Sequence, residues 1–395
     1  MRMKNSISTI LLQEAIELIS GRDLQKSQYN AEEKGIPYIM GASNINNGRF
    51  IIERWTDTPT VIGKKGDIIL SVKGTVGEFF ILEEEAHLSR QVMALRVKNG
   101  YLNEYIKYFL AFYIEKLKEK AKGMIPGITR EDILLAQIPN FGLEMQEKII
   151  NVLKLSESII NKRKAQIEEL DQLTQSVFWE MFGDPLTNDK DFPSKSLGDI
   201  ATVGSSKRVF VEELVGEGVP FYRGTEIGSL ALGEDISPTL FITKEHYRNL
   251  SQSSGIPKVG DLLMPSICPD GRIWRVRDNT PFYFKDGRVL WIHFTINDIN
   301  TIYIQYALKD KLIRDYLNIA SGTTFAELKI FSLKKVKLMI PPLDLQNKFS
   351  LHVDKVQEKM TFLKKNLIEM QNLYNSLQQR AFKGELFTQE KLPNA

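Results

Sequence analysis

The sequence of 395 residues contains one cysteine, Cys268, which excludes an intramolecular disulfide. Scarce cysteine is typical of proteins in a reducing compartment, so we expect a cytoplasmic protein. The four histidines, at positions 87, 246, 293 and 352, have no zinc-ligand spacing to one another or to Cys268. We therefore expect no structural metal site.

Long apolar runs and an excess of one charge are missing as well. Residues 1–20 mix acidic and basic side chains with the apolar ones, which interrupts any signal peptide or membrane-spanning core. The whole chain has 52 basic and 49 acidic residues, a net charge of +3. Residues 1–143 (19 basic, 17 acidic) and 190–342 (20 basic, 17 acidic) are only weakly basic. We expect no membrane partner, and charge favours a polyanion partner only weakly.

Catalytic signatures are absent from the sequence. There is no Gly-x-x-x-x-Gly-Lys-Ser/Thr phosphate loop and no Asn/Asp-Pro-Pro-Tyr/Phe motif of adenine methylation. Acidic groups such as Glu83, Glu84, Glu85 and Asp298 are explained as a solvated surface at least as well as by a Mg²⁺ site. We expect a chain that is not an enzyme and binds no cofactor of its own.

What the sequence does contain is an internal repeat with an offset of 200 residues. The residues kept in both copies are Leu143/Leu343, Gln146/Gln346, Lys148/Lys348, Lys164/Lys364, Glu169/Glu369, Leu173/Leu373, Ser176/Ser376 and Phe182/Phe382. Each copy of this segment follows a long stretch of mixed pattern. A head followed by a helix, twice over, is the organisation that such a duplication predicts.

The repeated segments have the spacing of coiled-coil helices. Apolar residues of the second copy step alternately by four and three, at positions 349, 353, 356, 360, 363, 367, 370, 374, 377 and 381. The first copy keeps this register with polar interruptions at Ser156, Arg163 and Thr174. Each helix would be roughly 55 Å long. Periodicity leaves open whether the two helices pair with each other, antiparallel, or with another chain.

The heads share landmarks in the same order. Residues 35–38 match 218–221, and Lys65-Gly66-Asp67 matches Val259-Gly260-Asp261 before a short apolar strand. A further strand and a helical stretch then lead to the long helix. Each head therefore reads as α+β with mostly antiparallel strands. The loops between landmarks differ strongly, which suggests two binding surfaces that read different things.

This architecture resembles the specificity subunit of a type I restriction-modification enzyme. The resemblance covers nearly the whole chain. It is carried by the two-copy order, by residues 341–346 and more loosely 139–146 before the helices, and by the helix ends Glu180-Met181-Phe182-Gly183-Asp184-Pro185 and Ala381-Phe382-Lys383-Gly384-Glu385-Leu386. Asn140-Phe141-Gly142 replaces the expected proline pair at the first helix. The resemblance implies two target-recognition domains separated by two helices in an antiparallel coiled coil with a pseudo-two-fold repeat.

The resemblance also implies a division of the chain and a set of partners. The expected segments are 1–143 and 190–342 as recognition domains, 144–182 and 343–387 as spacer helices, 183–189 as linker and 388–395 as tail. Each head would read one half of a bipartite site on double-stranded DNA. The helices would set the gap and dock two methyltransferase subunits. S-adenosylmethionine, ATP and Mg²⁺ are expected on partner subunits, and whether restriction or translocase subunits join is left open.

Candidate DNA-binding residues are basic or amide side chains in polar loops beside the landmarks. Arg and Lys match guanine or phosphate, and Asn and Gln match adenine. Each of these side chains is also explained as solvated surface, although Arg22 and Arg208 follow matching elements. The candidates are Arg22, Lys26, Asn44, Arg49, Lys73, Lys207, Arg208, Arg223, Arg272 and Arg275.

Two other classes of function stay open on the sequence alone. One is a coiled-coil scaffold whose heads bind proteins, favoured by the regular heptads and the weak net charge. The other is a self-sufficient methyltransferase or nuclease. Salt-sensitive binding to duplex DNA distinguishes the specificity subunit from the scaffold, and activity of the purified chain alone would indicate the enzyme.

Overall fold

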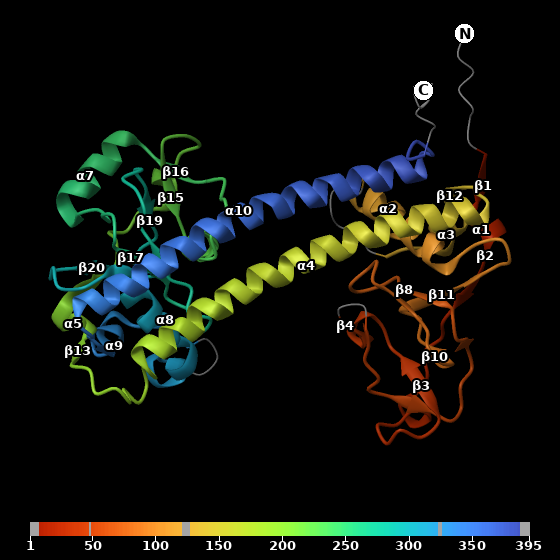
Figure 1. Cartoon of the computed structure of the whole chain (residues 1–395), viewed down its shortest axis with the longest axis horizontal. Coiled ribbons are helices and arrows are strands. Elements are labelled where there is room, and N and C mark those ends of the chain that lie inside the picture. Colours follow the sequence, from red (N-terminus) through yellow and green to blue (C-terminus); the bar gives the residue numbers. More distant parts are fainter. Residues whose placement is uncertain (1–7, 47–48, 121–126, 323–325, 388–395) are drawn as a thin grey trace, which may run out of the picture. The chain divides into compact units, whose positions relative to one another are not determined.

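The computed structural model describes residues 8–46, 49–120, 127–322 and 326–387. The chain forms two compact units, one of Met1–Ala165 with Lys364–Ala395 and one of Gln166–Leu363. Each unit holds one α+β globular part, which we call the first and the second head, together with one end of each of two long helices (Figure 1). The predicted tail, 388–395, lies outside the described residues.

The main sheet of the first head is antiparallel and buried on both faces. Its strand order is β2 (Ile16–Ser20), β11 (Val92–Val97), β8 (Ile68–Ser71) and β9 (Phe79–Ile81). Side chains alternate along a strand. Ile68 and Leu70 therefore pack against helix α2 (Asn103–Lys120), while Ile69 packs on the opposite face.

That opposite face is covered by a smaller sheet of order β6-β3-β10-β7, in which β10 pairs with β3 in parallel. The core between the two sheets includes Ile39, Leu88 and Ala94. The strands of the small sheet are β3 (Ile36–Ile39), β6 (Trp55–Thr56), β7 (Ile62–Gly63) and β10 (Ala86–Leu88). The head is thus a helix layer, a main sheet and a small sheet.

The second head repeats these layers. Its main sheet has the order β14-β20-β17-β18, packed on α8 (Thr301–Ile319), and its small sheet has the order β16-β15-β19 with β15 and β19 parallel. This head also has α6 (Gly224–Ala231), which packs mainly against β17 and β18, and α7 (Lys244–Ser254), whose Leu250 packs against the small sheet. The strands are β14 (Ala201–Gly204), β15 (Val219–Tyr222), β16 (Phe241–Ile242), β17 (Leu262–Pro265), β18 (Trp274–Arg275), β19 (Tyr283–Phe284) and β20 (Val289–Phe294).

Further short elements lie within each head or between the head and its long helices. In the first unit they are β1 (Thr9–Leu11), α1 (Leu12–Ala15), η1 (Lys26–Gln28), η2 (Ala42–Asn44), β4 (Ile45–Asn46), β5 (Arg49–Phe50), α3 (Arg130–Leu134) and β12 (Gln137–Pro139). In the second they are β13 (Ser194–Ser196), α5 (Leu197–Ile200), η3 (Val211–Glu213), α9 (Ile330–Lys334) and β21 (Lys337–Met339). β1 pairs with β12 as β13 pairs with β21, which extends the repeat to the chain segments beside the helices.

The repeated Gly-Asp turn buries a carboxylate in both heads. The preceding glycine has φ of +91° or +93°, a conformation that favours glycine. Asp67 accepts hydrogen bonds from Arg96 at 3.0 and 2.8 Å, and Asp261 accepts from Trp291 at 2.8 Å and His293 at 2.9 Å. Each acid therefore fastens β11 or β20 to the turn before β8 or β17, which explains why the turn is kept although its partners differ.

Each long helix is fixed to its own head by the repeated glutamine. The helices are α4 (Leu143–Phe182) and α10 (Leu343–Phe382). Gln146 is fully buried and accepts from the Leu102 N–H at 2.9 Å, and Gln346 accepts from the Asn300 N–H at 2.8 Å. Both amides also donate to carbonyls at the helix start. The repeat thus preserves the angle at which the helix leaves the head.

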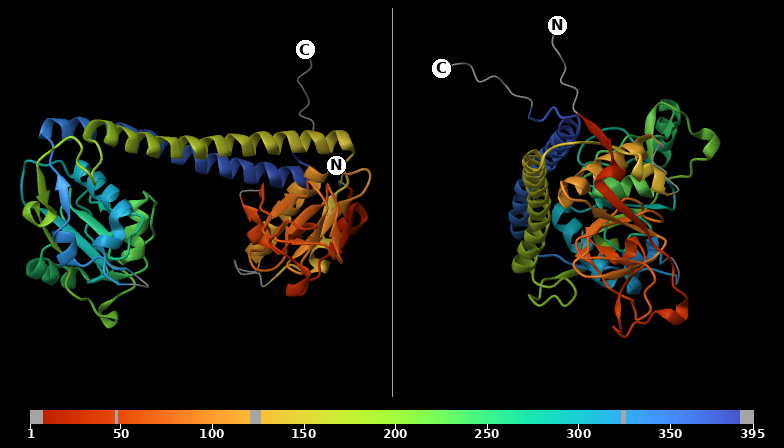
Figure 2. Two further views of the ribbon diagram at one scale, coloured as in Figure 1. Left: turned by 90° about the horizontal axis from the view of Figure 1, so that it is seen from below. Right: turned by 90° about the vertical axis from the view of Figure 1, so that its right-hand side faces the viewer.

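The two long helices pair antiparallel, as predicted. In the first unit the start of α4 lies beside the end of α10, where Ile149 and Leu153 share a core with Ala381 and Phe382 (Figure 2). In the second unit the end of α4 meets the start of α10, with ring centroids of Phe178 and Phe349 5.3 Å apart. The α+β class and the antiparallel helix pair are confirmed.

Candidate nucleic-acid interface

Four loops converge in each head at the edge where the two parallel strands of the small sheet end. In the first head they are residues 21–26, 40–44, 72–77 and 89–91. In the second they are residues 205–210, 223–226, 266–271 and 285–288. The last of these, which joins the small sheet to the main sheet, touches the other three. We call residues 89–91 and 285–288 the hub turns.

In the first head the hub turn is fastened by main-chain hydrogen bonds. The Ser89 N–H donates to Ile39 O at 2.9 Å, and the Val72 N–H donates to Gln91 O at 2.8 Å. The Arg90 N–H reaches Asp23 Oδ1 at 3.0 Å, and the Arg90 side chain forms an ion pair with the same carboxylate. One short turn therefore holds three loops in register.

The hub turn of the second head makes the two equivalent main-chain bonds, whereas its bond to the first loop uses a serine side chain. The Lys285 N–H donates to Tyr222 O at 2.8 Å, and the Ser266 N–H donates to Arg288 O at 2.9 Å. The Ser205 hydroxyl donates to Val289 O at 2.7 Å and accepts from the Gly287 N–H at 2.9 Å. The second turn is one residue longer than the first, yet its two ends are bound in the same way.

The first loop of each head is anchored by matching residues of the small sheet. His87 Nε2 donates to Arg22 O at 2.9 Å, while its Nδ1 accepts from the N–H groups of Thr60 and Val61. Burial lowers the pKa of His87, consistent with this neutral tautomer. In the second head Tyr283 Oη accepts from the Lys207 N–H at 3.0 Å. The loops that carry Arg22 and Lys207 are thus held at equivalent places.

A basic pocket lies among the second head's loops. Its volume is about 390 Å³, and its lining includes Arg223, Lys285, Arg288, Thr225 and Ser266. Burial alone would raise the pKa of Glu226, but hydrogen bonds from Arg223 and Thr225 outweigh it and lower the pKa to about 2. Arg223 is therefore committed to an internal ion pair. Lys285 and Arg288 are held only at 3.6 Å, by Asp286 and Glu327, and can turn to an anionic ligand.

Three of the first head's predicted residues are exposed on or beside this edge: Arg22 and Lys26 in the first loop and Lys73 in the third. Asn44 is buried instead. Its side chain accepts from the Met40 N–H and donates to Ile51 O, so it holds the second loop together and offers no amide edge to a base. Arg49 lies in β5, and its side chain is outside the described residues.

In the second head Arg223 lines the pocket with Lys285 and Arg288 of the hub turn, and the Lys207 main chain is bound to Tyr283. Arg208 is exposed beside Lys207 and lies 5.1 Å from the centroid of the Phe210 ring. Arg272 lies apart from them, paired with Asp270 at 2.7 Å and packed on α6. Arg275 is half-buried in β18. Burial and the neighbouring Arg277 lower its pKa.

Sequence reasoning missed the hub turns, and with them Arg90, Gln91, Lys285 and Arg288. Gln91 and Arg90 are exposed, and the Arg288 side chain is 65% exposed. The signal was present, because both turns directly precede the matched strands that begin at Val92 and Val289. Because the two turns differ in length by one residue, aligning the two copies at a constant offset did not reveal that they are equivalent.

Two absences bear on the chemistry. Within residues 8–46, 49–120, 127–322 and 326–387, no group of three or more His, Cys, Asp or Glu side chains is placed to hold a metal ion. No helix in the same ranges is long and apolar enough to cross a membrane. Cys268 is buried, and burial raises its pKa to about 12, so the thiol is not a nucleophile at neutral pH.

Comparison with known proteins gives consistent results. The family model described as type I restriction modification DNA specificity domain matches residues 8–169 and 189–372. A putative type I restriction enzyme specificity subunit of Haemophilus influenzae is 26% identical over 332 residues, 82% of this chain and 80% of that protein. The MjaIX type I restriction enzyme specificity subunit of Methanocaldococcus jannaschii is 25% identical over 356 residues, 82% and 79% of the two chains.

Solved structures share the fold. A chain from a type I R-M system, studied for complex assembly and conformational transition, superposes with a TM-score of 0.60 at 17% identity, covering 98% of this chain and 100% of that one. The S subunit of a type I restriction-modification system from M. genitalium gives a TM-score of 0.51 at 19% identity, covering 97% and 98%. The arrangement of two heads and two long helices is therefore common to these chains.

Proposed function

Because the chain belongs to the type I restriction-modification DNA specificity domain family, and is the DNA specificity subunit of such a system, we propose that its heads read the two halves of a bipartite DNA site. On this proposal the long helices set the gap between the halves and dock two methyltransferase subunits. The chain itself binds the DNA and orients the methyltransferase subunits on it. S-adenosylmethionine, ATP and Mg²⁺ are held by partner subunits, which supply methyl transfer and any translocation or cleavage.

The observation that carries the reading of two half-sites is the pair of four-loop surfaces. Main-chain bonds of the hub turn are the same in both heads, while the side chains presented there differ. Recognition of two different sequences requires a rigid four-loop surface, which we call the platform, that presents different side chains in the two heads. Exposed Lys73, Arg90, Lys207 and Arg208 supply phosphate contacts around each platform.

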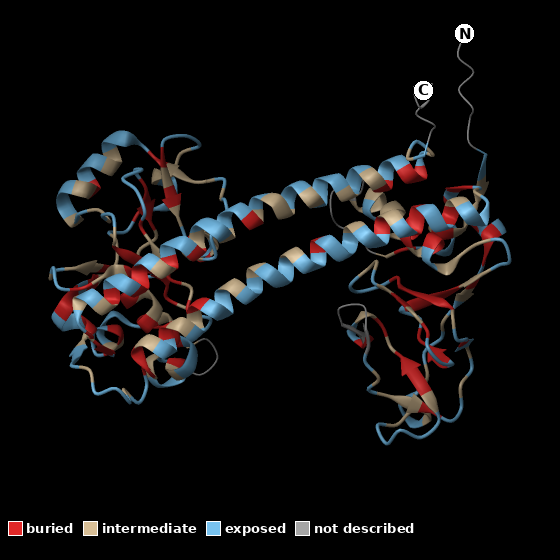
Figure 3. Cartoon of the chain, in the orientation of Figure 1, coloured by how far each residue is buried: buried red, intermediate tan, exposed pale blue. Residues whose placement is uncertain are grey.

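Docking of two identical partners is supported by exposed residues that the repeat keeps. Glu169, Leu173 and Ser176 lie one helical turn apart on one face of α4, and residues 369, 373 and 376 occupy the same face of α10. Leu173 is 47% and Leu373 60% exposed, and the outer faces of both helices are largely solvent-accessible (Figure 3). Internal packing does not require these leucines, whereas one kind of partner contacting both copies would.

The two docking faces can be tested separately. Leu173→Asp and Leu373→Asp should each lower the number of methyltransferase subunits per chain from two to one, and the double variant should retain neither. Native mass spectrometry of the reconstituted complex counts the subunits. Leu155→Asp, also exposed on α4 but outside the repeat, is the control and should keep both. Loss of both subunits in a single variant, or of neither in the double variant, would contradict this assignment.

DNA reading is tested in the complex with its methyltransferase subunits. Sequencing of methylated DNA should show a split motif with adenine modified on both strands. Replacing the first head by that of a relative should change only one half of the motif. A motif in one piece, or a change in both halves, would overturn the proposal. Binding that does not weaken with salt would instead favour a protein-binding scaffold, since phosphate contacts release counterions.

A further inference from the structure

We propose that the last residue of each hub turn is the main base-reading position of its head. Gln91 reads an adenine in the first half-site and Arg288 reads a guanine in the second. This inference rests on the proposed reading of a bipartite site and adds to it the residues and the bases.

Gln91 and Arg288 occupy equivalent positions by their main-chain bonds. Each directly precedes an inner strand of the main sheet, β11 or β20. The carbonyl of each accepts the N–H of the residue that follows β8 or β17, at 2.8 and 2.9 Å. The carbonyl of that residue then accepts from the Ile128 N–H in the first head and the Leu328 N–H in the second. Four matched bonds therefore place both Cα atoms at the same point of the platform.

The backbone at this point is fixed while the side chain is available. Gln91 is exposed, and no described residue hydrogen-bonds its side-chain amide. The amide lies over Gly41, where an added Cβ would stand 2.6 Å from Gln91 Oε1. Arg288 is 65% exposed and has one carboxylate neighbour, Glu327, at 3.6 Å, beyond hydrogen-bonding distance. A preorganised main chain with an uncommitted polar side chain lowers the cost of specific binding.

The two side chains match different base edges. The glutamine amide oxygen accepts from N6 of adenine while its nitrogen donates to N7. An arginine guanidinium donates two hydrogen bonds, to O6 and N7 of guanine. Neighbouring cations take the phosphates: Lys73 and Arg90 in the first head, Lys285 in the second.

A role in phosphate binding alone explains this pair of residues less well. A phosphate-binding position would hold a cation in both heads, whereas the first head presents a neutral amide there. Arg90 stands one residue earlier and is held by Asp23 at 2.7 Å, so the first turn places its cation beside the reading position. In the first hub turn the cation, Arg90, and the base-reading residue, Gln91, are therefore different residues.

The test uses the full chain with its methyltransferase subunits, and the methylated motif as readout. Arg288→Gln should relax the guanine preference at one position of the second half-site by roughly tenfold to a hundredfold and leave the first half unchanged. Gln91→Glu, which can accept from cytosine N4, should move one position of the first half from adenine toward cytosine. Arg248→Gln removes the same charge from the exposed face of α7 and should leave the motif as it was.

Arg288→Lys separates base reading from phosphate contact. Lysine keeps the charge but loses the planar fork of two donors, so the guanine preference should still weaken. An unchanged motif in Arg288→Lys, with or without a uniform loss of affinity, overturns the inference. A wild-type motif in one piece would defeat the bipartite function itself, whereas a split wild-type motif that both variants leave unchanged defeats only this residue assignment. Melting temperatures of all variants confirm that they are folded.

Discussion

In both units the end of one long helix packs against a helix of the head, a contact that we call the joint, but the side chains around it differ. In the first unit the end of α10 meets α2, and in the second the end of α4 meets α8. Tyr105 and Tyr303 each donate from their hydroxyl to a main-chain carbonyl, of Pro139 and Met339, at 2.9 and 3.0 Å. These matched tyrosines fix the alignment of α2 with α8, and the side chains seven residues further along can be compared directly.

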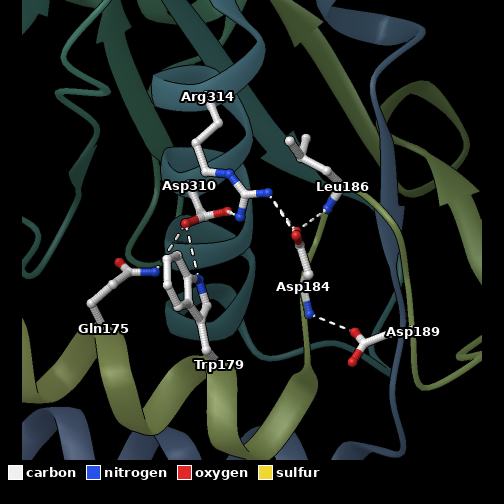
Figure 4. Close-up of polar contacts among 7 residues, drawn as sticks. All are labelled: Gln175, Trp179, Asp184, Leu186, Asp189, Asp310 and Arg314. Atoms are coloured by element: carbon white, nitrogen blue, oxygen red, sulfur yellow. Dashed lines mark hydrogen bonds and ion pairs between the residues drawn. The ribbon is translucent and has the colours of Figure 1, made fainter.

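In the second unit that position holds a buried acid, Asp310 (Figure 4). Its Oδ1 accepts from Gln175 at 3.0 Å and from the indole of Trp179 at 3.1 Å, both on α4. Arg314, one turn along α8, donates to Asp184 at 2.7 and 2.8 Å just after α4 ends. A network of charge and hydrogen bonds therefore ties the last turns of α4 to α8.

In the first unit the equivalent position holds an aromatic ring. Phe112 stacks on Phe382, with ring centroids 5.3 Å apart, and the ammonium of Lys116 lies 4.1 Å from the Phe112 centroid. Lys116 corresponds to Arg314. The geometry of the joint is thus kept by the buried phenylalanines at both helix ends, while the surrounding contacts are polar in one unit and apolar in the other.

Removing the shared phenylalanine should have the largest effect. Phe182 is fully buried and Phe382 is 8% exposed, and Phe→Ala in such sites costs about 3–5 kcal/mol of unfolding free energy. We expect Phe182→Ala and Phe382→Ala to destabilise by similar amounts, each exposing its own unit to limited proteolysis in urea. Phe362→Ala, 62% exposed on α10, is the matched control and should change little. A small effect at either buried site would break the parallel between the two joints.

The second-largest loss of stability is expected from Asp310, which is present in only one of the two joints. Asp310→Ala leaves the Trp179 and Gln175 donors without an acceptor and should cost about 1–3 kcal/mol of unfolding free energy. Asp310→Asn keeps an acceptor oxygen and should cost less. Urea unfolding of the full chain, followed by intrinsic tryptophan fluorescence, measures both. Equal losses in the two variants would mean that the negative charge of Asp310, rather than its hydrogen bonds, holds the joint.

The stability of the second joint should depend on pH. Burial raises the pKa of Asp310, and the Trp179 hydrogen bond and the charge of Arg314 offset only part of that rise. A group with a raised pKa in the folded state contributes stability below its unfolded pKa and loses it as pH rises through the folded value. The stability of Asp310→Asn relative to wild type should therefore increase as pH rises from 4 to 8. The opposite slope in paired urea titrations would show that the ion pair outweighs burial.

The smallest effect is expected from the exposed arm of the network. Arg314 hydrogen-bonds Asp184 and holds the pKa of that carboxyl below its usual range. Both groups are partly exposed, so Arg314→Gln should cost no more than about 1 kcal/mol, and less in high salt. Lys116→Gln in the first unit is the counterpart and should show little dependence on pH. A loss as large as that of Asp310→Ala would contradict this order.

Much of the fold could be read from local pattern. Gln146 and Gln346, the Gly-Asp turns and Phe182 and Phe382 were visible as repeated residues, and each has a packing or hydrogen-bonding task in the structure. The edge proposed to read DNA was harder to predict. Asn44 has an amide that could recognise a base, but this amide is hydrogen-bonded within its own loop. The hub turns were missed because main-chain bonds between distant loops make them central, and such bonds leave no pattern in side-chain identity.

Taken by itself, the sequence determined that there are two related heads and two long heptad helices, since the period of apolar residues follows from the geometry of a single helix. Only the tertiary structure decided the partners of those helices. A heptad seam is compatible with either direction of pairing, and the packing of Phe382 into the core of the first unit and of Phe182 into the second selects the antiparallel one. The structure likewise decided which loops meet, because convergence at a strand end depends on contacts between residues far apart in the chain.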